Sequence, residues 1–174
     1  MHSVDELWQE YDQTGVPIMN GGAGVGADGR HSDSKYYGVS AVWLYRRTEQ
    51  GLEILYQKRS DKVDNGGKYD ISAGGHHNYG ETPIEGAVRE CREEIGAVID
   101  PAKLVLELSL NTGYNLLHLY SYDWTGQPDN FHFDDNEVSE VRWVPLSDLK
   151  FREQFVKEPI KNIDIYFDVL KRRA

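Results

Sequence analysis

Cysteine and long apolar runs are what this 174-residue sequence has least of. It contains one cysteine, which cannot form a disulfide within the chain, so nothing indicates an oxidising compartment. It has no apolar run of about 18 residues and no signal-peptide pattern, which argues against a membrane-spanning or exported chain. We therefore expect a cytoplasmic protein that does not use a membrane as its partner.

Basic residues are scarce relative to acidic ones. The chain has 19 Lys and Arg against 29 Asp and Glu, which gives a formal net charge of −10. This sign of charge argues against sequence-independent binding of a nucleic acid polymer. It does not argue against a small phosphate-bearing substrate, because a cation can mediate contact between carboxylates and phosphate.

The length predicts a single domain over residues 1–174, with residues 1–34 as an N-terminal extension. Within the extension, residues 20–34 form a glycine-rich segment that contains the spacing G-x-G-x-x-G. No strand pattern precedes this segment and no helical pattern follows it, so a loop is favoured over a dinucleotide site. The same segment contains His31.

Hydrophobic patterning predicts a chain that is mainly β, with two principal helices. Residues 1–14 are expected to form a short helix or an edge element. The predicted strands cover residues 36–47, 52–59, 69–73, 104–111, 116–124 and 137–144, and a last helix covers residues 159–172.

The other helix has clear start and stop signals. Thr82 can act as its N-cap, Pro83 suits the first helical position, and Glu85 completes a capping box. Gly96 is a natural C-terminal stop. These signals predict a helix over residues 83–95.

One side of this helix is apolar and another is acidic. With 3.6 residues per turn, the apolar face comprises Ile84, Ala87, Val88, Cys91 and Ile95. Glu90, Glu93 and Glu94 lie in a different sector, at a spacing that brings their carboxylates together. Arg89 is placed to orient one carboxylate but cannot neutralise three, whereas a divalent cation could.

Two interpretations of the acidic sector remain open. A solvated helix face is the common one for glutamate-rich helices. The alternative is a site for Mg²⁺ or Mn²⁺, the ions that all-oxygen ligands favour. Gly74 and Gly75 precede the helix and would let backbone groups approach a metal or a phosphate, which favours the metal site.

These residues resemble the Nudix box, G-x5-E-x7-R-E-U-x-E-E-x-G-U, where U is a bulky aliphatic residue. The fixed positions are all filled, by Gly75, Glu81, Arg89, Glu90, Glu93, Glu94 and Gly96. Only the U positions are relaxed, to Cys91 and Ala97. The resemblance implies an α/β/α sandwich with a mixed β-sheet. It also implies Mg²⁺-dependent or Mn²⁺-dependent hydrolysis of a diphosphate linked to another moiety.

The resemblance also implies roles for individual residues. The positions that resemble metal ligands are the Gly74 carbonyl, Glu90, Glu93 and Glu94. Glu81 and Arg89 resemble supporting residues, as Gly75 does. Glu93, Glu94 and Glu137 are the candidates for catalytic carboxylates, with Glu137 the first choice for the base. Arg59 and His76 are candidates for contact with substrate or metal.

A finer resemblance is carried by residues 5–8, 11–15, 56–60 and 69–76. These segments look like the isopentenyl-diphosphate-isomerase-like branch of this superfamily, and the resemblance extends over about residues 5–150. The isomerases place a catalytic cysteine where this chain has Gly74, and Cys91 is expected to be packed in the core. The favoured function is therefore hydrolysis of a nucleoside diphosphate derivative or a similar small molecule. The alternatives are isopentenyl-diphosphate isomerisation and a non-catalytic diphosphate-binding module. A homodimer is common in the family resembled.

Overall fold

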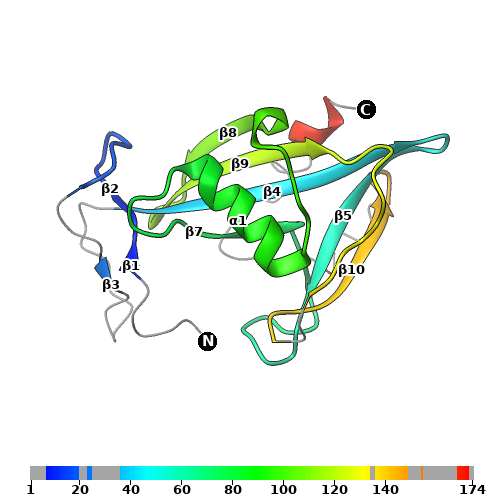
Figure 1. Ribbon diagram of the computed structural model, residues 1–174, viewed down its shortest axis with the longest axis horizontal. Helices are drawn as coiled ribbons and strands as arrows, with labels where there is room; N and C mark the ends of the chain where they lie inside the picture. Colours follow the sequence, from blue (N-terminus) through cyan, green and yellow to red (C-terminus); the bar gives the residue numbers. More distant parts are fainter. Residues whose placement is uncertain are drawn as a thin grey trace.

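A mixed β-sheet forms the centre of the fold (Figure 1). The computed structural model describes residues 7–19, 23–24, 36–133, 136–148, 154 and 168–172. The main strand order in the described part is β10-β5-β4-β9-β8. These strands are β4 (Tyr36–Thr48), β5 (Gly51–Arg59), β8 (Val105–Asn111), β9 (Asn115–Asp123) and β10 (Val138–Pro145). Each lies within one or two residues of a predicted strand, so these predictions are confirmed.

The long strand β4 organises the sheet. Along one edge, residues 37–45 pair in parallel with residues 115–123 of β9. Along the other edge, β4 pairs antiparallel first with β7 (Ala73–His76) and then with β5. The strands β5 and β7 therefore share β4 as a neighbour, at different positions along its length.

The single strand predicted over residues 69–73 is wrong. The structure has two short strands instead, β6 (Tyr69–Asp70) paired with β5 and β7 paired with β4. Between them, the Ser72 hydroxyl donates to the Leu55 carbonyl at 2.5 Å and accepts from the Leu44 amide at 2.9 Å. The side chain thus satisfies backbone groups of β4 and β5 where these strands separate, and the chain crosses from one to the other.

Helix α1 (Pro83–Ile95) covers one face of the sheet, and its predicted bounds are confirmed. Its buried side chains Ala87, Cys91 and Ile95 pack on Val42 and Leu44 of β4. The predicted core position Ile84 is wrong, since this side chain is 42% exposed. In the first turn the buried residue is Gly86, where a Cβ atom would lie 2.9 Å from the His77 ring, so this turn faces His77 and directs Ile84 outward.

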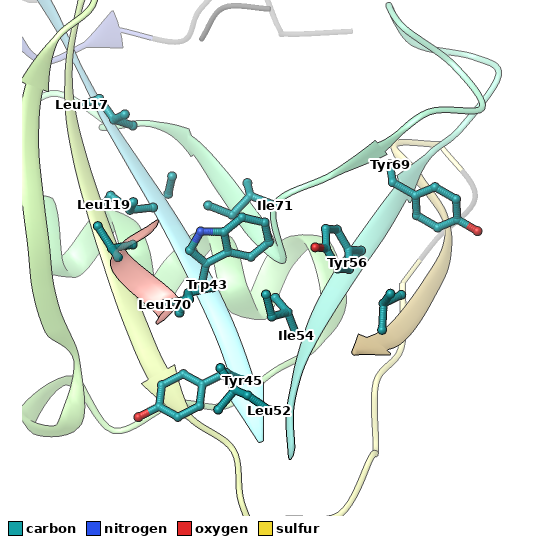
Figure 2. Packing of buried hydrophobic residues seen from close by; sticks show 13 residues of the cluster. Trp43, Tyr45, Leu52, Ile54, Tyr56, Tyr69, Ile71, Leu117, Leu119 and Leu170 are labelled. Carbon is teal, nitrogen blue, oxygen red and sulfur yellow. The ribbon is translucent and has the colours of Figure 1, made fainter. Parts of the chain in front are cut away.

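The opposite face of the sheet carries a second apolar cluster, shown in Figure 2. Trp43, Ile54 and Leu119 are fully buried there, and Leu170 packs against them from the C-terminal end of the chain. Residues 168–171 are helical, which agrees with the predicted last helix; residues 159–167 of that prediction lie outside the described residues. Helical segments on both faces of a mixed sheet confirm the predicted α/β/α arrangement.

The N-terminal segment forms edge elements, the second of the two structures expected for it. Strand β1 (Leu7–Trp8) pairs with β3 (Ala23–Gly24), and β2 (Glu10–Tyr11) pairs with the start of β4. The remainder of the glycine-rich segment, His31 included, lies outside the described residues. A short 3-10 helix, η1 (Pro101–Lys103), links α1 to β8. Among the described helices, none has the length and apolar character needed to cross a membrane.

Candidate active site

The start of α1 is fixed by the predicted capping box. The Thr82 hydroxyl accepts from the Glu85 amide at 3.3 Å, and the Glu85 carboxylate accepts from the Thr82 amide at 2.8 Å. Gly96 ends the helix in the left-handed region, with φ of 68°, and its amide donates to the Arg92 carbonyl. The cap contributes about 1 kcal/mol to helix stability and sets which residues face the sheet.

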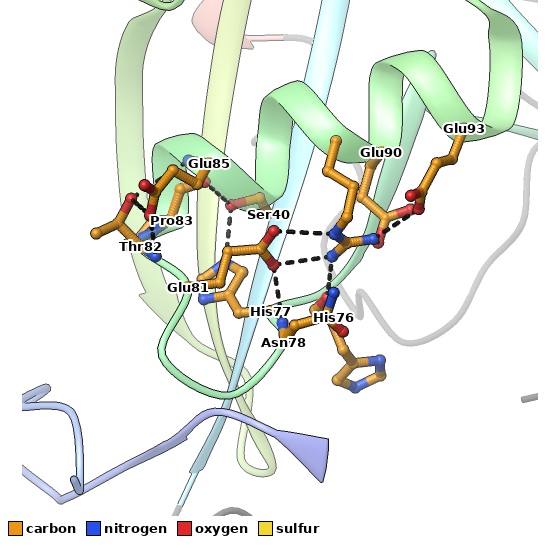
Figure 3. A network of polar contacts seen from close by, with 11 residues as sticks. Ser40, His76, His77, Asn78, Glu81, Thr82, Pro83, Glu85, Glu90 and Glu93 are labelled. Carbon is orange, nitrogen blue, oxygen red and sulfur yellow. Dashed lines mark hydrogen bonds and ion pairs between the residues drawn. The ribbon is translucent and has the colours of Figure 1, made fainter. Parts of the chain in front are cut away.

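Arg89 is the hub of a polar network that includes Glu81, Glu90 and Glu93, which are labelled in Figure 3. It donates two hydrogen bonds to Glu81, at 2.9 and 3.0 Å. Its Nη1 atom also donates to Glu90 at 2.8 Å and to Glu93 at 3.0 Å, and Nη2 donates to the His76 carbonyl at 2.8 Å. The sequence predicted that Arg89 orients one carboxylate; it contacts three, and bidentate pairing fixes its plane.

Glu90 lies against the backbone of Gly75. A Cβ atom at position 75 would lie 2.3 Å from Glu90 Oε1, so only glycine leaves room for this carboxylate. Burial raises the pKa of Glu90, while the nearby Arg89 guanidinium works in the opposite direction. The glycine predicted to support the site therefore does so by allowing close approach of a buried acid.

Glu94 is held by a backbone amide and by a side-chain amide. Its Oε2 atom accepts from the Gly74 amide at 2.8 Å and from the Gln57 side chain at 3.2 Å. Burial, and then the neighbouring Glu90 carboxylate, raise the pKa of Glu94 well above its usual range. Gly74 thus contacts the acid through its amide, and metal ligation by the Gly74 carbonyl stays a prediction.

The predicted acids line one cleft of about 620 Å³. Its wall comprises Lys62, Val63, Glu90, Glu93, Glu94, Asn136, Glu137 and Val138. Glu137 reaches this cleft because the Ser60 amide donates to its carbonyl at 2.8 Å and because β10 pairs with β5. The structure therefore brings Glu137 to the same cavity as the three acids of α1.

Lys62 and Asn136 are the polar cleft residues that the sequence reasoning missed. Lys62 lies in the loop after β5, and Asn136 lies two residues before the start of β10. Neither belongs to the sequence pattern that identified the acids. The pairing of β5 with β10 would have indicated both residues, but this pairing joins segments that are far apart in the sequence.

The two residues predicted to contact substrate or metal both have other partners. Arg59 donates to the Asp64 carbonyl at 2.8 Å and pairs with Asp70 at 3.3 Å, and it is not part of the cleft wall. The His76 ring stacks on Trp8, with centroids 3.6 Å apart and planes 2° from parallel. Figure 3 shows the His76 ring turned away from the carboxylates, so His76 reaches the network through its carbonyl.

A second polar chain fixes the beginning of α1. The Ser40 hydroxyl donates to the Pro83 carbonyl at 2.6 Å, so it accepts from His77 Nε2, at 2.8 Å. His77 Nδ1 then accepts from the Tyr11 hydroxyl at 3.0 Å, which defines a neutral ring with its proton on Nε2. Burial, and then the nearby His118, lower the pKa of His77 to about 3. Sequence reasoning named no partner for this histidine.

The donor chemistry of the cleft fits a hard divalent cation, because Glu90, Glu93, Glu94 and Glu137 offer only carboxylate oxygens. The raised pKa of Glu94 also fits an acid whose charge lacks compensation. Within the described residues, no three His, Cys, Asp or Glu side chains are gathered closely enough to hold an ion. Arg89 holds two of these acids, Glu90 and Glu93, in the arrangement seen.

Comparison with known proteins gives a consistent result. Residues 35–164 match the family described as NUDIX domain. Over 159 residues the chain is 28% identical to Nudix hydrolase 3 of Arabidopsis thaliana, a match that covers 84% of this chain and 19% of that protein. Over 132 residues it is 29% identical to isopentenyl-diphosphate Delta-isomerase of Photobacterium profundum, covering 69% of this chain and 71% of that protein. The chain therefore spans less than a fifth of the Arabidopsis relative.

A structural comparison supports the fold assignment. The NUDIX domain of Shewanella oneidensis NrtR, in a cocrystal structure with ADP ribose, is similar to this chain with a TM-score of 0.62. The two are 15% identical, and the match covers 85% of this chain and 92% of that chain. At this identity the likeness shows a shared fold.

Proposed function

The chain belongs to the NUDIX domain family, and from this premise we propose that it is a metal-dependent hydrolase that cleaves a diphosphate linkage. The proposed substrate class is a nucleoside diphosphate derivative or a similar small molecule. The observation that carries the proposal is the gathering of Glu90, Glu93, Glu94 and Glu137 around one cleft. The family match, the Arabidopsis hydrolase and the NUDIX domain crystallised with ADP ribose support it.

Glu90, Glu93 and Glu94, joined by the Gly74 carbonyl, would hold Mg²⁺ or Mn²⁺. Such an ion polarises phosphorus–oxygen bonds and lowers the pKa of bound water. The Glu93 side chain is 53% exposed, so it has room to rotate away from Arg89 toward an ion. Glu90 and Glu94 are held more tightly, by Arg89 and by the Gly74 amide.

Glu137 is the proposed base. It comes from a different part of the chain than the proposed ligands on α1, it lines the same cleft, and it is exposed to solvent. A carboxylate in this place can accept a proton from a water that attacks phosphorus while the α1 acids retain their oxygens for the metal. This division of roles assigns one carboxylate to proton transfer and three to binding.

Lys62 is the proposed phosphate contact. It is the cationic side chain among the described residues that line the cleft, and the acids of that cleft would otherwise repel a diphosphate. An ammonium group can donate hydrogen bonds to phosphoryl oxygens, and it offsets negative charge that the carboxylates leave in the cleft.

The isomerase alternative is disfavoured by the packing at position 74. A Cβ atom there would lie 2.8 Å from the Ser40 carbonyl oxygen and 3.1 Å from the Ala41 Cα atom. The cysteine that the isomerases place at this position would force β7 away from β4. The chain's own Cys91 is fully buried, and burial raises the pKa of its thiol, so it does not supply the missing group.

A substrate screen tests the proposal. The full chain would be incubated with ADP-ribose, other nucleoside diphosphate derivatives, dinucleotide polyphosphates and isopentenyl diphosphate, with Mg²⁺ and then Mn²⁺. Products would be identified by mass spectrometry and phosphorus NMR. We expect cleavage between the two phosphorus atoms of at least one substrate. Conversion of isopentenyl diphosphate to its dimethylallyl isomer would replace the proposal, and binding without turnover of any compound would contradict it.

A further inference from the structure

The N-terminal segment contacts the loop that leads into the catalytic helix. Residues 7–19, called here the N-terminal strap, precede residue 35, where the family match begins. The Gln9 amide donates to the His77 carbonyl at 2.9 Å, the Gly38 amide donates to the Gln9 carbonyl at 3.0 Å, and the His77 amide donates to the Gly38 carbonyl at 2.9 Å. These three bonds join the strap, β4 and the loop at one junction.

The Gln9 side chain adds a more specific contact. It is only 1% exposed, and its Oε1 atom accepts from the Gly80 amide at 2.8 Å. Its amide group donates to the carbonyls of Glu10 and Ile18, at 2.8 and 3.1 Å. The oxygen and the nitrogen of this buried side-chain amide are therefore both hydrogen-bonded. Through these bonds the Gln9 side chain connects Glu10 and Ile18 of the strap to Gly80 of the loop.

Aromatic contacts reinforce this link on either side of Gln9. Trp8 stacks on the His76 ring, and the Tyr11 hydroxyl donates to His77. The Tyr79 hydroxyl donates to the Met19 carbonyl. The strap therefore contacts four residues of the loop, which are His76, His77, Tyr79 and Gly80.

The positions of the cleft acids depend on this loop. Gly80 directly precedes Glu81, which receives both hydrogen bonds of the Arg89 fork, and the His76 carbonyl accepts a further bond from Arg89. Arg89 in turn holds Glu90 and Glu93. A displacement of the loop therefore moves the arginine that orients two of the proposed metal ligands.

We propose that the N-terminal strap positions the metal-binding carboxylates through the loop of residues 76–81, and that Gln9 is its principal positioning residue. The inference rests on the proposed metal site, since it concerns the affinity of that site. It assigns a role to a segment that lies outside the matched family region.

The test compares Gln9→Met with Gln50→Met in the full chain. Methionine has a similar length and removes both the acceptor for Gly80 and the two donors. Gln50 lies in the exposed β4–β5 turn and gives the same chemical change away from the site. Mn²⁺ affinity would be measured by electron paramagnetic resonance, and exchange of the Gly80 amide hydrogen by NMR, with amides of β9 as the internal reference.

We expect Gln9→Met to weaken Mn²⁺ binding by at least about tenfold, the scale for loss of a group that supports metal ligands. The Gly80 amide should exchange faster relative to β9, and Gln50→Met should match the wild type in both measurements. Wild-type Mn²⁺ affinity in folded Gln9→Met would overturn the inference, as would an unchanged exchange rate at Gly80.

A gentler pair of variants decides the question if Gln9→Met does not fold. Tyr11→Phe removes one hydroxyl, which bonds His77, and Tyr122→Phe removes a buried hydroxyl that accepts from the Asp100 amide. Tyr11→Phe should weaken Mn²⁺ binding relative to Tyr122→Phe, and equal affinities would overturn the inference. Because Mn²⁺ binding and hydrogen exchange need no turnover, a failure to hydrolyse any diphosphate would refute the proposed activity without deciding the role of the strap.

Discussion

Glu94 and Glu137 are chemically identical side chains in different surroundings, and their proposed roles differ accordingly. Glu94 is tied to the Gly74 amide and the Gln57 side chain, and burial raises its pKa. Glu137 lines the same cleft and lies at an exposed position just before β10. The buried, fixed acid suits binding of a cation, whereas the accessible one suits exchange of protons with water.

Replacing Glu137 by Gln tests this division directly. The change keeps the shape of the side chain but removes its ability to accept a proton, so we expect turnover to fall by at least about a hundredfold. Mn²⁺ affinity should stay within about twofold of the wild type, because the proposed ligands lie on α1. Steady-state kinetics and a Mn²⁺ titration would measure both. The control is Glu140→Gln, whose side chain accepts from Tyr69; equal turnover in the two variants would remove Glu137 as the base.

Lys62→Ala should raise KM for the diphosphate by about tenfold or more, since hydrogen bonds to charged groups contribute about 1.5–3 kcal/mol. Lys62→Arg should retain most of the affinity, because it keeps the positive charge. Lys68→Ala, in the same loop but outside the cleft wall, is the matched control. The assignment fails if Lys62→Ala and Lys68→Ala have the same KM.

At the scale of secondary-structure elements, strand β7 contains two adjacent glycines that face different neighbours. Gly74 faces the backbone of β4, where added atoms would meet the Ser40 carbonyl. Gly75 faces the end of a side chain, the Glu90 carboxylate. A backbone neighbour cannot move without separating strands, whereas a side chain can rotate.

The two alanine variants should therefore differ in kind. Gly74→Ala should destabilise the fold by about 1–3 kcal/mol, the usual range for overpacking. Gly75→Ala should leave stability closer to wild type but displace Glu90 and weaken Mn²⁺ binding by about tenfold or more. Urea denaturation and Mn²⁺ titration would distinguish them. The same loss of stability in both variants, with no specific loss of affinity in Gly75→Ala, would contradict this account.

Prediction from sequence succeeded for elements whose signals are local. The bounds of α1 follow from Thr82, Pro83, Glu85 and Gly96, which act within one turn of the helix ends. The division between β6 and β7 was missed, because it depends on bonds from Ser72 to strands that are distant in the sequence. Local patterning carries no information about such partners.

The same distinction applies to the site. The acids of α1 follow from a spacing pattern, but the place of Lys62 in the cleft depends on how β5 and β10 pair. The network of Arg89 was underestimated for a similar reason. Helical spacing indicates Glu93 as a neighbour, whereas Glu81 comes close only because the preceding loop folds back on α1.

At the scale of the whole molecule, the buried His77 couples stability to pH. Its pKa is about 3 in the folded chain, against an ordinary value of 6.5. The unfolded chain therefore binds more protons between these values, and the stability conferred by the neutral ring is present above pH 6.5 and lost as pH falls toward 3. The ring also joins the N-terminal strap to the first turn of α1, through Tyr11 and Ser40.

Comparison with His77→Gln isolates this contribution. Between pH 7 and pH 5, we expect the free energy of unfolding of the wild type to fall by about 1–2 kcal/mol more than that of the variant. Urea denaturation at several pH values would measure the difference, in which the contributions of the other titrating groups largely cancel. Parallel pH profiles for the two proteins would show that His77 does not titrate in this way.

The central claim is that the acids of one cleft support metal-dependent cleavage of a diphosphate, and Glu94 is the one whose pKa burial raises well above its usual range. The most direct test measures hydrolysis of the best diphosphate substrate against Mg²⁺ concentration, for the wild type and for Glu94→Gln. We predict no turnover by the wild type in the presence of a chelator, recovery on addition of Mg²⁺, and turnover at least about a hundredfold lower in folded Glu94→Gln at saturating Mg²⁺. Turnover that survives chelation, or a wild-type rate in Glu94→Gln, would contradict the claim.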